Sequence, residues 1–480
     1  MSDPVTPGRR ARTREQLRPR GQTLVALVLV GILVAGALLT QGVLGERDRG
    51  TGAVGIVASG AWYCPHGGGK DWEAVISVAN PGSEPVEVRA RRLGPERGPG
   101  SERVRVPPGG SVELVAPATD RGSATVVEYF GGHVAAGWVA RTGGDDVGIS
   151  AEPCLSEAGP VWTLGDGTAE AKEEQTFVVV MNPFSGDAVF TLEVLRASDP
   201  PGNVSEWDDY VLPAGRSVAF ELDEFAEGDR VLGATITSSL GRVAASTLGI
   251  SKDRGVRGVI GWQGPTPSGA YLPGAGQDGD SVVTVIAPED RSTAYAASML
   301  GSHGSQVFAK GKEQLQRGET AQRLDIAAPD PSTIWLRGGR DRPGVFATRR
   351  TSGRTQDLGA TAGAPAPGAQ WIVFPSVGEA PQQPVLVVTN PGADAAEVTL
   401  TTLPREGDRV TRQLQVRPGR TVEAPTALFG PSPRAPVLVR VSDGAVVTAT
   451  ASYSQGKDGV AAYAVSAGAP IDPAWVADPP

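Results

Sequence analysis

Side chains that could perform acid–base or metal chemistry are few and scattered in this sequence. Its three histidines are His66, His133 and His303, and its two cysteines are Cys64 and Cys154. A zinc site of the usual local kind needs four such ligands at close spacing, which these residues do not provide. Acidic stretches at 145–146 and 278–280 suit calcium, but neither forms a complete ligand loop. We therefore predict no metal site and no cofactor.

The stretch His66-Gly67-Gly68-Gly69 has the form of the oxyanion-hole loop of some esterases. Such a loop works with a nucleophile elbow, Gly-x-Ser-x-Gly, and the sequence contains no such elbow. A glycine-rich turn is the simpler interpretation. We therefore predict no catalytic residue, and an exported hydrolase remains only a remote alternative.

Tryptophan is the residue type that most suggests binding. Exposed rings stack on sugars, whereas buried rings fill cores. Trp207 lies beside two aspartates and Tyr210, so Trp207 and Tyr210 are candidate glycan contacts. For most of the other tryptophans outside the module boundaries we expect core packing; these are Trp72, Trp138, Trp262 and Trp335.

Cys64 and Cys154 form an even pair, which in an oxidising compartment predicts one disulfide. It would close a loop of about 90 residues and, in the chain-entropy model, stabilise the fold by about 4 kcal/mol. Two unpaired buried thiols are the alternative.

An Asn-Pro turn recurs along the chain and indicates how these side chains are positioned. An apolar run enters each copy, Asn takes the first turn position, Pro presets φ at the second, and Gly tolerates a positive φ at the third. The spacings are 102, 105 and 103 residues if the degraded copy at Ala287 is counted. The intact copies are Asn80-Pro81, Asn182-Pro183 and Asn390-Pro391.

A second turn follows each Asn-Pro turn about 30 residues later, and alternating apolar residues such as Val86, Val88 and Ala90 predict half-buried strands between them. A short helix is expected only at 313–324. An aromatic residue also precedes each unit, and a fifth copy follows the last unit; the five are Trp62, Trp162, Tyr271, Trp371 and Trp475. Five markers around four units suggest shared strands at the joints or closure of the last unit on the first, as in propellers. We favour four sandwiches in a row, because about 100 residues suits a sandwich.

The first 44 residues predict export. Six arginines and two acidic residues precede 23–44, which carries no charge and is long enough, as a helix, to span a bilayer. The basic flank places the N-terminus in the cytoplasm and the rest outside, in a single-pass plasma-membrane protein. A cleavable signal peptide, with Ala35-Gly36-Ala37 as the cleavage site, is the alternative.

The expected fold class is therefore all-β, with an N-terminal transmembrane helix followed by four tandem immunoglobulin-like β-sandwich repeats. The expected divisions are a basic tail (1–22), a signal-anchor helix (23–44), a stalk (45–58) and the repeats 59–158, 159–266, 267–367 (divergent) and 368–480. The net charge of −9 argues against a nucleic-acid partner.

Two resemblances follow from these motifs. The run from Asn80-Pro81-Gly82 to Val115 resembles bacterial immunoglobulin-like adhesion modules, which implies a fold and no activity. The basic tail, the apolar segment and Trp62-Tyr63-Cys64-Pro65 resemble an uncharacterised family of membrane-anchored extracellular actinobacterial proteins. That resemblance implies an extracellular repeat protein and brings no site residues.

We therefore expect a non-enzymatic, membrane-anchored extracellular scaffold or protein-interaction ectodomain, with a cell-envelope protein as partner. A cell-wall glycan-binding protein is the alternative.

Overall fold

The computed structural model describes residues 58–476, except for 97–99, 144–145, 147, 171–173, 198–201, 227, 253, 265–268, 275–279, 288–292, 316–319, 328–330, 339–345, 353–357, 376–383, 425–427, 429–433 and 456–460. The chain divides into two units, 1–56 and Val57–Pro480, and the description below concerns the second.

The described chain is all-β, with three short 3-10 turns among its strands. None of its helices is long and apolar enough to cross a membrane, so the fold class expected from the sequence was wrong in including a transmembrane helix. The segment 23–44, to which that helix was assigned, lies outside the described residues.

The strands form four modules, each with two antiparallel sheets. Module 1 contains β1 (Ser59–Cys64), β2 (Glu73–Ala79), β3 (Val86–Leu93), β4 (Ser101–Val106), β5 (Ser111–Pro117), β6 (Ala124–Phe130), β7 (Ala135–Arg141) and β8 (Ile149–Pro153). Module 2 contains β9 (Val161–Gly167), β10 (Glu174–Asn182), β11 (Ala188–Arg196), β12 (Gly202–Asn203), η1 (Ser205–Trp207), β13 (Tyr210–Leu212), β14 (Arg216–Glu221), η2 (Asp223–Phe225), β15 (Leu232–Leu240), β16 (Ala244–Ser251), β17 (Gly255–Ile260) and β18 (Trp262–Gln263).

Module 3 contains β19 (Gly269–Gly274), β20 (Asp280–Ile286), β21 (Thr293–Gly301), β22 (Gly304–Leu315), β23 (Ala321–Ala327), β24 (Ser332–Gly338), β25 (Phe346–Ser352) and β26 (Leu358–Thr361). Module 4 contains β27 (Gln370–Val373), β28 (Val385–Asn390), β29 (Ala396–Thr402), β30 (Thr411–Val416), β31 (Arg420–Glu423), β32 (Val437–Asp443), β33 (Val447–Gln455), β34 (Ala461–Ala467), β35 (Ala469–Pro470) and η4 (Pro473–Trp475). The repeat and its sandwich-like all-β character are confirmed. The short helix expected at 313–324 is not: β22 runs to Leu315 and β23 begins at Ala321.

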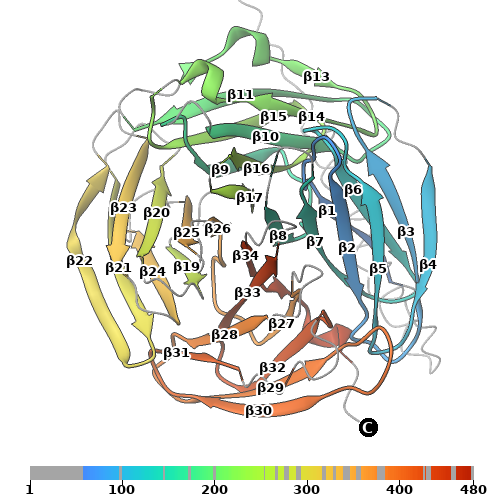
Figure 1. The fold of residues 1–480 in the computed structure, drawn as a ribbon, viewed down its shortest axis with the longest axis vertical. Helices are drawn as coiled ribbons and strands as arrows, with labels where there is room; N and C mark the ends of the chain where they lie inside the picture. The colour runs from blue at the N-terminus through green and yellow to red at the C-terminus, as the bar shows by residue number, and fades with distance from the viewer. Residues whose placement is uncertain are drawn as a thin grey trace, which may run out of the picture. The chain divides into compact units, whose positions relative to one another are not determined.

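One sheet of each module, here called the axial sheet, ends in a strand at the centre of the ring in Figure 1. The axial sheets have the orders β5-β2-β7-β8, β14-β10-β16-β17, β23-β20-β25-β26 and β31-β28-β33-β34. The other sheets, here called flanking sheets, are β1-β6-β3-β4, β12-β11-β15-β9-β18 with β13 beside β11, β19-β24-β21-β22 and β30-β29-β32-β27-β35.

The four central strands close a ring. β8 contacts β17 and β34, and β26 contacts the same two strands from the other side. The modules of this unit therefore surround an axis, and the row of sandwiches that we favoured from the sequence is wrong. The fifth aromatic marker takes part in this closure, because Trp475 stacks on His133 of module 1 with ring centroids 4.5 Å apart.

The Asn of the repeated turn is a buried hydrogen-bonding centre. Asn80 accepts from the amide of Gly82 at 2.9 Å and donates to the carbonyls of Glu84 and Val106 at 2.7 and 3.3 Å. It thus fixes the turn and links it to the strand before the second turn. Asn182 and Asn390 make the corresponding contacts, with Phe184, Gly186 and Leu212, and with Gly392, Asp394 and Val416.

The expected role of glycine in this turn needs correction. The positive φ occurs in the second turn instead, at Gly109, Gly215 and Gly419. Gly82 has no positive φ, and Phe184 takes the same position in module 2 with the corresponding bond to Asn182, so this turn position does not require glycine.

Equivalent Ser or Thr residues, two positions after the second-turn glycine, connect each axial sheet to the preceding flanking sheet. The Ser111 hydroxyl donates to the carbonyl of Leu403, and the Thr421 hydroxyl to that of Leu300. At the other two joints the bonds are Thr320 Oγ1 to the Arg196 carbonyl and the Ser217 amide to the Gly94 carbonyl. The joint between modules 4 and 1 therefore uses the same contact as a joint between consecutive modules.

Candidate functional site: an aromatic pocket on the axis

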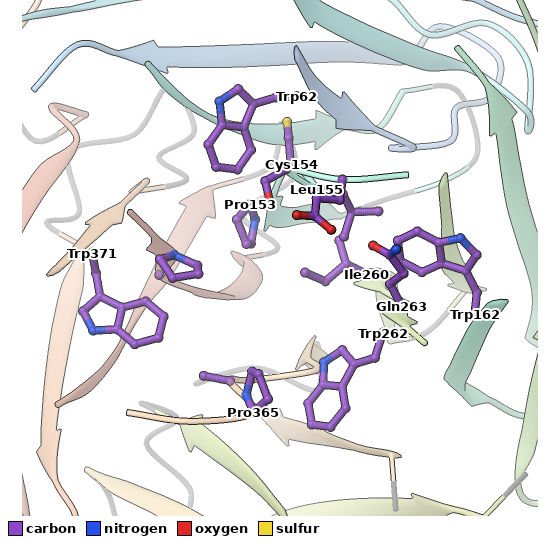
Figure 2. A pocket seen from close by; sticks show the side chains of 17 residues that line it. Trp62, Pro153, Cys154, Leu155, Trp162, Ile260, Trp262, Gln263, Pro365 and Trp371 are labelled. Atoms are coloured by element: carbon purple, nitrogen blue, oxygen red, sulfur yellow. The ribbon is translucent and has the colours of Figure 1, made fainter. Parts of the chain in front are cut away.

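A cavity of about 310 Å³ opens where the central strands end, and we call it the axial pocket. Segments from all four modules line it: 153–157, 260–263, 363–365 and 468–470, together with three boundary tryptophans. Figure 2 shows the rings of Trp62, Trp162, Trp262 and Trp371 around an open centre. The pocket is therefore a product of the ring, and no single module contains it.

The indole N–H groups of the boundary tryptophans are occupied by the fold. Trp62 donates to the carbonyl of Val134 at 2.6 Å, and Trp162 and Trp371 donate to the equivalent carbonyls of Val243 and Val446. Each of these carbonyls lies directly before a strand of the same module, β7, β16 or β33, so the N–H group holds the ring at the start of that strand. Trp62, Trp162 and Trp371 are only 1–2% exposed, so each presents a small area of carbon and π surface to the cavity.

Few polar side chains line the pocket. It consists of the exposed Ser156 and Glu157 from module 1 and of Gln263 from module 2. The lining residues, all within the described chain, include no histidine and no lysine, and Cys154 is in a disulfide. The arrangement is suited to holding a ligand that is mainly apolar and carries one polar or positive group.

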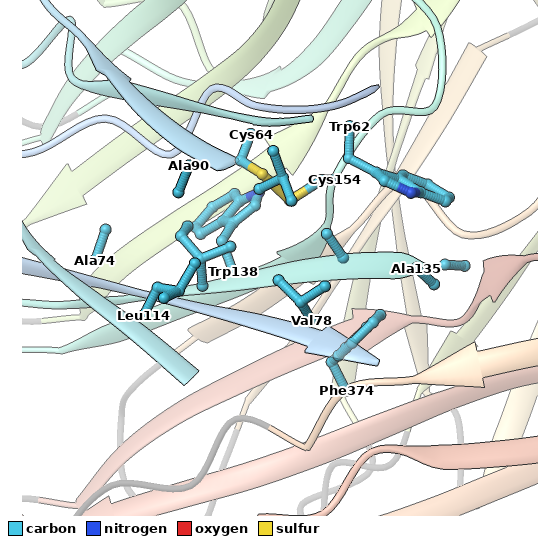
Figure 3. Packing of buried hydrophobic residues seen from close by; sticks show 14 of the residues in the cluster. Trp62, Cys64, Ala74, Val78, Ala90, Leu114, Ala135, Trp138, Cys154 and Phe374 are labelled. Atoms are coloured by element: carbon cyan, nitrogen blue, oxygen red, sulfur yellow. A yellow bond between two sulfur atoms is a disulfide. The ribbon is translucent and has the colours of Figure 1, made fainter. Parts of the chain in front are cut away.

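The disulfide expected between Cys64 and Cys154 is confirmed. Figure 3 shows it among the buried side chains of module 1, near Trp62 and Trp138. It joins the end of β1 to the residue after β8, and Cys154 itself lines the pocket. The bond therefore holds one wall of the pocket to the first strand of the module.

A buried carboxyl group, that of Glu152, lies next to the axial pocket in the chain. Glu152 precedes the lining residue Pro153 and is 1% exposed. Neither of its oxygens has a hydrogen-bond partner of good geometry among the described residues. Burial raises the pKa of Glu152 well above its ordinary value, and the hydroxyl of Thr361 and the amides of Ala362 and Ala467 only partly oppose this. The axis thus contains a carboxyl group that favours its neutral form.

The glycan contacts expected at Trp207 and Tyr210 do not fit their positions. Trp207 is 8% exposed and packs edge-on against Phe220 and Phe225. Tyr210 is half-buried against Phe190 and Phe220. Trp207 belongs to the core of module 2, and Tyr210 packs against that core with part of its ring exposed.

The histidines lie apart from one another. His66 is buried and hydrogen-bonded to the Gly67 carbonyl and the Thr125 hydroxyl, and burial lowers its pKa to about 4. His133 lies under Trp475, and His303 is exposed beyond the end of β21.

Sequence reasoning missed the pocket residues, although the signal was present. The boundary aromatics were interpreted as markers of repeat ends. Their recurrence in every module, next to chain segments that return to the axis, is what places several rings around one cavity. Glu157 and Gln263 carried no pattern that could be recognised.

Comparisons with known proteins give a family and little else. A family described as "Family of unknown function (DUF5719)" matches residues 115–366, which confirms the expected resemblance only as membership of a family without an assigned function. No curated protein matches the chain. Among solved structures it is similar to a tetra-tandem repeat in the extending region of a large adhesion protein, with 10% identity over 86% of this chain and 100% of that chain. The TM-score is 0.11, at which the likeness supports no conclusion.

Proposed function

Since the chain belongs to the DUF5719 family of unknown function, we propose from its own geometry that it is a non-enzymatic interaction protein. It captures a partner protein by holding one lysine or arginine side chain of that partner in the axial pocket. The observation that carries the proposal is the set of four indoles around one cavity with a carboxylate at its edge.

The chemistry of the pocket supports a cationic side chain. A cation in contact with an indole ring gains about 0.5–2 kcal/mol, and the small exposed fraction of the four rings, between 1% and 8%, puts the gain here at the low end. The aliphatic stem of lysine or arginine packs on apolar surface while its head reaches a polar group, here Glu157. A cavity of about 310 Å³ is at the small end of ligand sites and accommodates a single long side chain.

Two properties of the whole chain support a protein partner in the cell envelope. The net charge of −9 attracts a basic partner at long range. The disulfide is a bond that persists in oxidising compartments.

The test uses the full chain and three short peptides that differ only at a central Lys, Leu or Glu. By titration calorimetry we expect the Lys peptide to bind, the Leu peptide to bind more weakly and the Glu peptide not to bind. Glu157→Gln should weaken the Lys peptide about two- to fivefold, as expected for an exposed charge pair. Ser156→Phe, which places a ring at the exposed edge, should abolish binding.

The matched control is Glu87→Gln, because Glu87 is an exposed acid in a surface pair outside the pocket. It removes the same charge and should leave the affinity unchanged. Equal affinity for the Lys and Glu peptides would contradict the proposal. Binding of envelope polysaccharide that Ser156→Phe abolishes would favour the glycan-binding alternative instead.

A further inference from the structure

A second hollow, separate from the axial pocket, lies at the joint between modules 1 and 2. It has a volume of about 430 Å³ and is lined by Arg91, Arg92, Arg216, Ser101 and Ser185, together with apolar and glycine residues. We call it the arginine pocket. Its described lining contains no acidic side chain, although the protein as a whole is acidic.

Two of the arginines that line the hollow, Arg91 and Arg216, come from different modules. Arg91 is at the end of β3, and its Nη2 donates to the Pro183 carbonyl at 2.6 Å. A Cβ on Gly215 would lie 3.3 Å from Nη1 of Arg91, so this guanidinium lies against the residue before Arg216. The carbonyl of Pro183 holds Arg91 in place without neutralising it.

Arg216 has an unused donor. Its Nη1 is buried and has no hydrogen-bond partner among the described residues. A buried N–H without an acceptor is costly, so a ligand that accepts from it is stabilised. The carboxylate of Asp187 accepts from the Ala214 amide, beside the hollow, and forms no ion pair with Arg216 within the described structure.

The other joints show that the fold itself does not require this pair. The position of Arg216 is taken in module 4 by Arg420, whose guanidinium donates to the carbonyl of Ser302 in the preceding module. The position of Arg91, eleven residues after the first residue of the Asn-Pro turn, is taken by Glu193, Ser298 and Thr401 in the other modules. The pairing of two arginines at one joint is therefore a local addition to the repeat.

The surroundings add to the positive potential. The guanidinium of Arg242 lies 4.9 Å from the ring centroid of Phe184, which lines the hollow. The exposed hydroxyls of Ser101 and Ser185 are further donors at the edge. Guanidinium groups bind tetrahedral oxyanions through paired N–H donors, which makes phosphate the natural ligand of such a site.

We propose that the arginine pocket binds a phosphoryl group, held between Arg91 of module 1 and Arg216 of module 2. The volume of about 430 Å³ exceeds that of a single phosphate and leaves room for the group that carries it. The phosphoryl group belongs either to a soluble phosphate ester or to a lipid headgroup. This site is independent of the axial pocket and does not rest on the function proposed for it.

The experiment measures binding of inorganic phosphate and glycerol 3-phosphate to the full chain by titration calorimetry. Sedimentation with phosphatidylglycerol vesicles, compared with phosphatidylcholine vesicles, tests the lipid source. We expect saturable binding of glycerol 3-phosphate. Arg216→Gln and Arg91→Gln should each lower its affinity about tenfold or more, because each removes charge-assisted hydrogen bonds. Arg216→Lys keeps the positive charge but loses the paired N–H donors of the guanidinium. Its affinity for glycerol 3-phosphate should lie between those of the native protein and Arg216→Gln.

The matched control is Arg105→Gln, which removes one positive charge from an exposed arginine of module 1. It should leave the affinity for glycerol 3-phosphate unchanged. Circular dichroism and thermal melting of each variant establish that it is folded. Vesicle binding that both arginine variants abolish would support the site and identify a lipid as the source. Unchanged affinity in both folded variants, or no saturable binding by any of the three probes, would overturn the proposal.

Discussion

The buried asparagine is the residue on which each regular module depends. Asn390 is 1% exposed and serves one amide and two carbonyls that lie 2, 4 and 26 residues away. Module 3 has Ala287 at this position, and its backbone amide donates to the Thr320 carbonyl, as the Asn80 amide donates to the Gly110 carbonyl. The backbone bond to the second turn is therefore kept in module 3 without an asparagine side chain.

Asn390→Ala should destabilise the protein by about 3 kcal/mol, because it leaves buried backbone groups unpaired. Asn390→Asp keeps the acceptor for Gly392 but places a buried carboxylate oxygen against the carbonyls of Asp394 and Val416, so its cost should be at least as large. Urea denaturation followed by circular dichroism measures the loss. Asp394→Ala is the control, because its exposed side chain is not used and its cost should stay within about 0.5 kcal/mol. An equal effect of Asn390→Ala and Asp394→Ala would show that the asparagine is unimportant.

Glu152 predicts a pH dependence of stability with a definite sign. Its pKa is raised in the folded state by burial, so the folded protein binds this proton more tightly than the unfolded chain. Stability is then greatest below the unfolded pKa, near 4.5, and falls as the pH rises towards the folded pKa. Above 4.5, Glu152→Gln should therefore become progressively more stable than the native protein, by up to about 1.4 kcal/mol per pH unit.

The measurement is the difference in unfolding free energy between Glu152→Gln and the native protein from pH 4 to pH 8. The difference cancels the opposite effect of His66, whose pKa is lowered to about 4 and which loses stability as the pH falls below 6.5. A difference that stays constant across this range would mean that Glu152 does not carry the buried proton.

At the scale of the element, the strands of the regular modules were predictable and their partners at the axis were not. Alternation in β3 puts Val86, Val88 and Ala90 in the core, as the pattern indicates. Such alternation can be read from a few consecutive residues, because successive side chains of a strand point alternately to the core and to solvent. The contact of β8 with β17 and β34 joins strands more than 100 and 300 residues apart, and no local pattern encodes it.

The wrong helix and the burial of Trp207, which the sequence did not indicate, have the same cause. Residues 313–324 are rich in good helix formers, but 313–315 pair with β21 and 321–324 pair with β20, so both described parts of the range are strands. Trp207 lies in an acidic, polar stretch that suggests a loop, yet η1 turns its ring into the core against Phe220. Local composition is overridden wherever a neighbouring element supplies a partner.

At the scale of the molecule, closure of the unit Val57–Pro480 depends on one joint that has no chain connection. Modules 1 and 4 are held by packing and hydrogen bonds, among them Phe374 against Gly137 and Trp475 against His133. Figure 3 shows Phe374 of module 4 beside Val78 and Ala135 of module 1. The axial pocket needs all four modules, so this joint connects stability with the proposed binding.

Weakening this joint should uncouple the modules. Phe374 is 3% exposed, and Phe374→Ala should cost about 3–5 kcal/mol, because it empties a packed interface. The same substitution at Phe130, which is 47% exposed on β6, should cost well under 1 kcal/mol. Calorimetry should show one cooperative transition for the native protein and for Phe130→Ala, but separate transitions for Phe374→Ala, with weaker binding of the Lys peptide. If Phe374→Ala melted in a single transition at the native temperature, the packing of Phe374 would contribute nothing to cooperativity. The joint between modules 1 and 4 would then depend on its other contacts, Ser111 with Leu403 and Trp475 with His133.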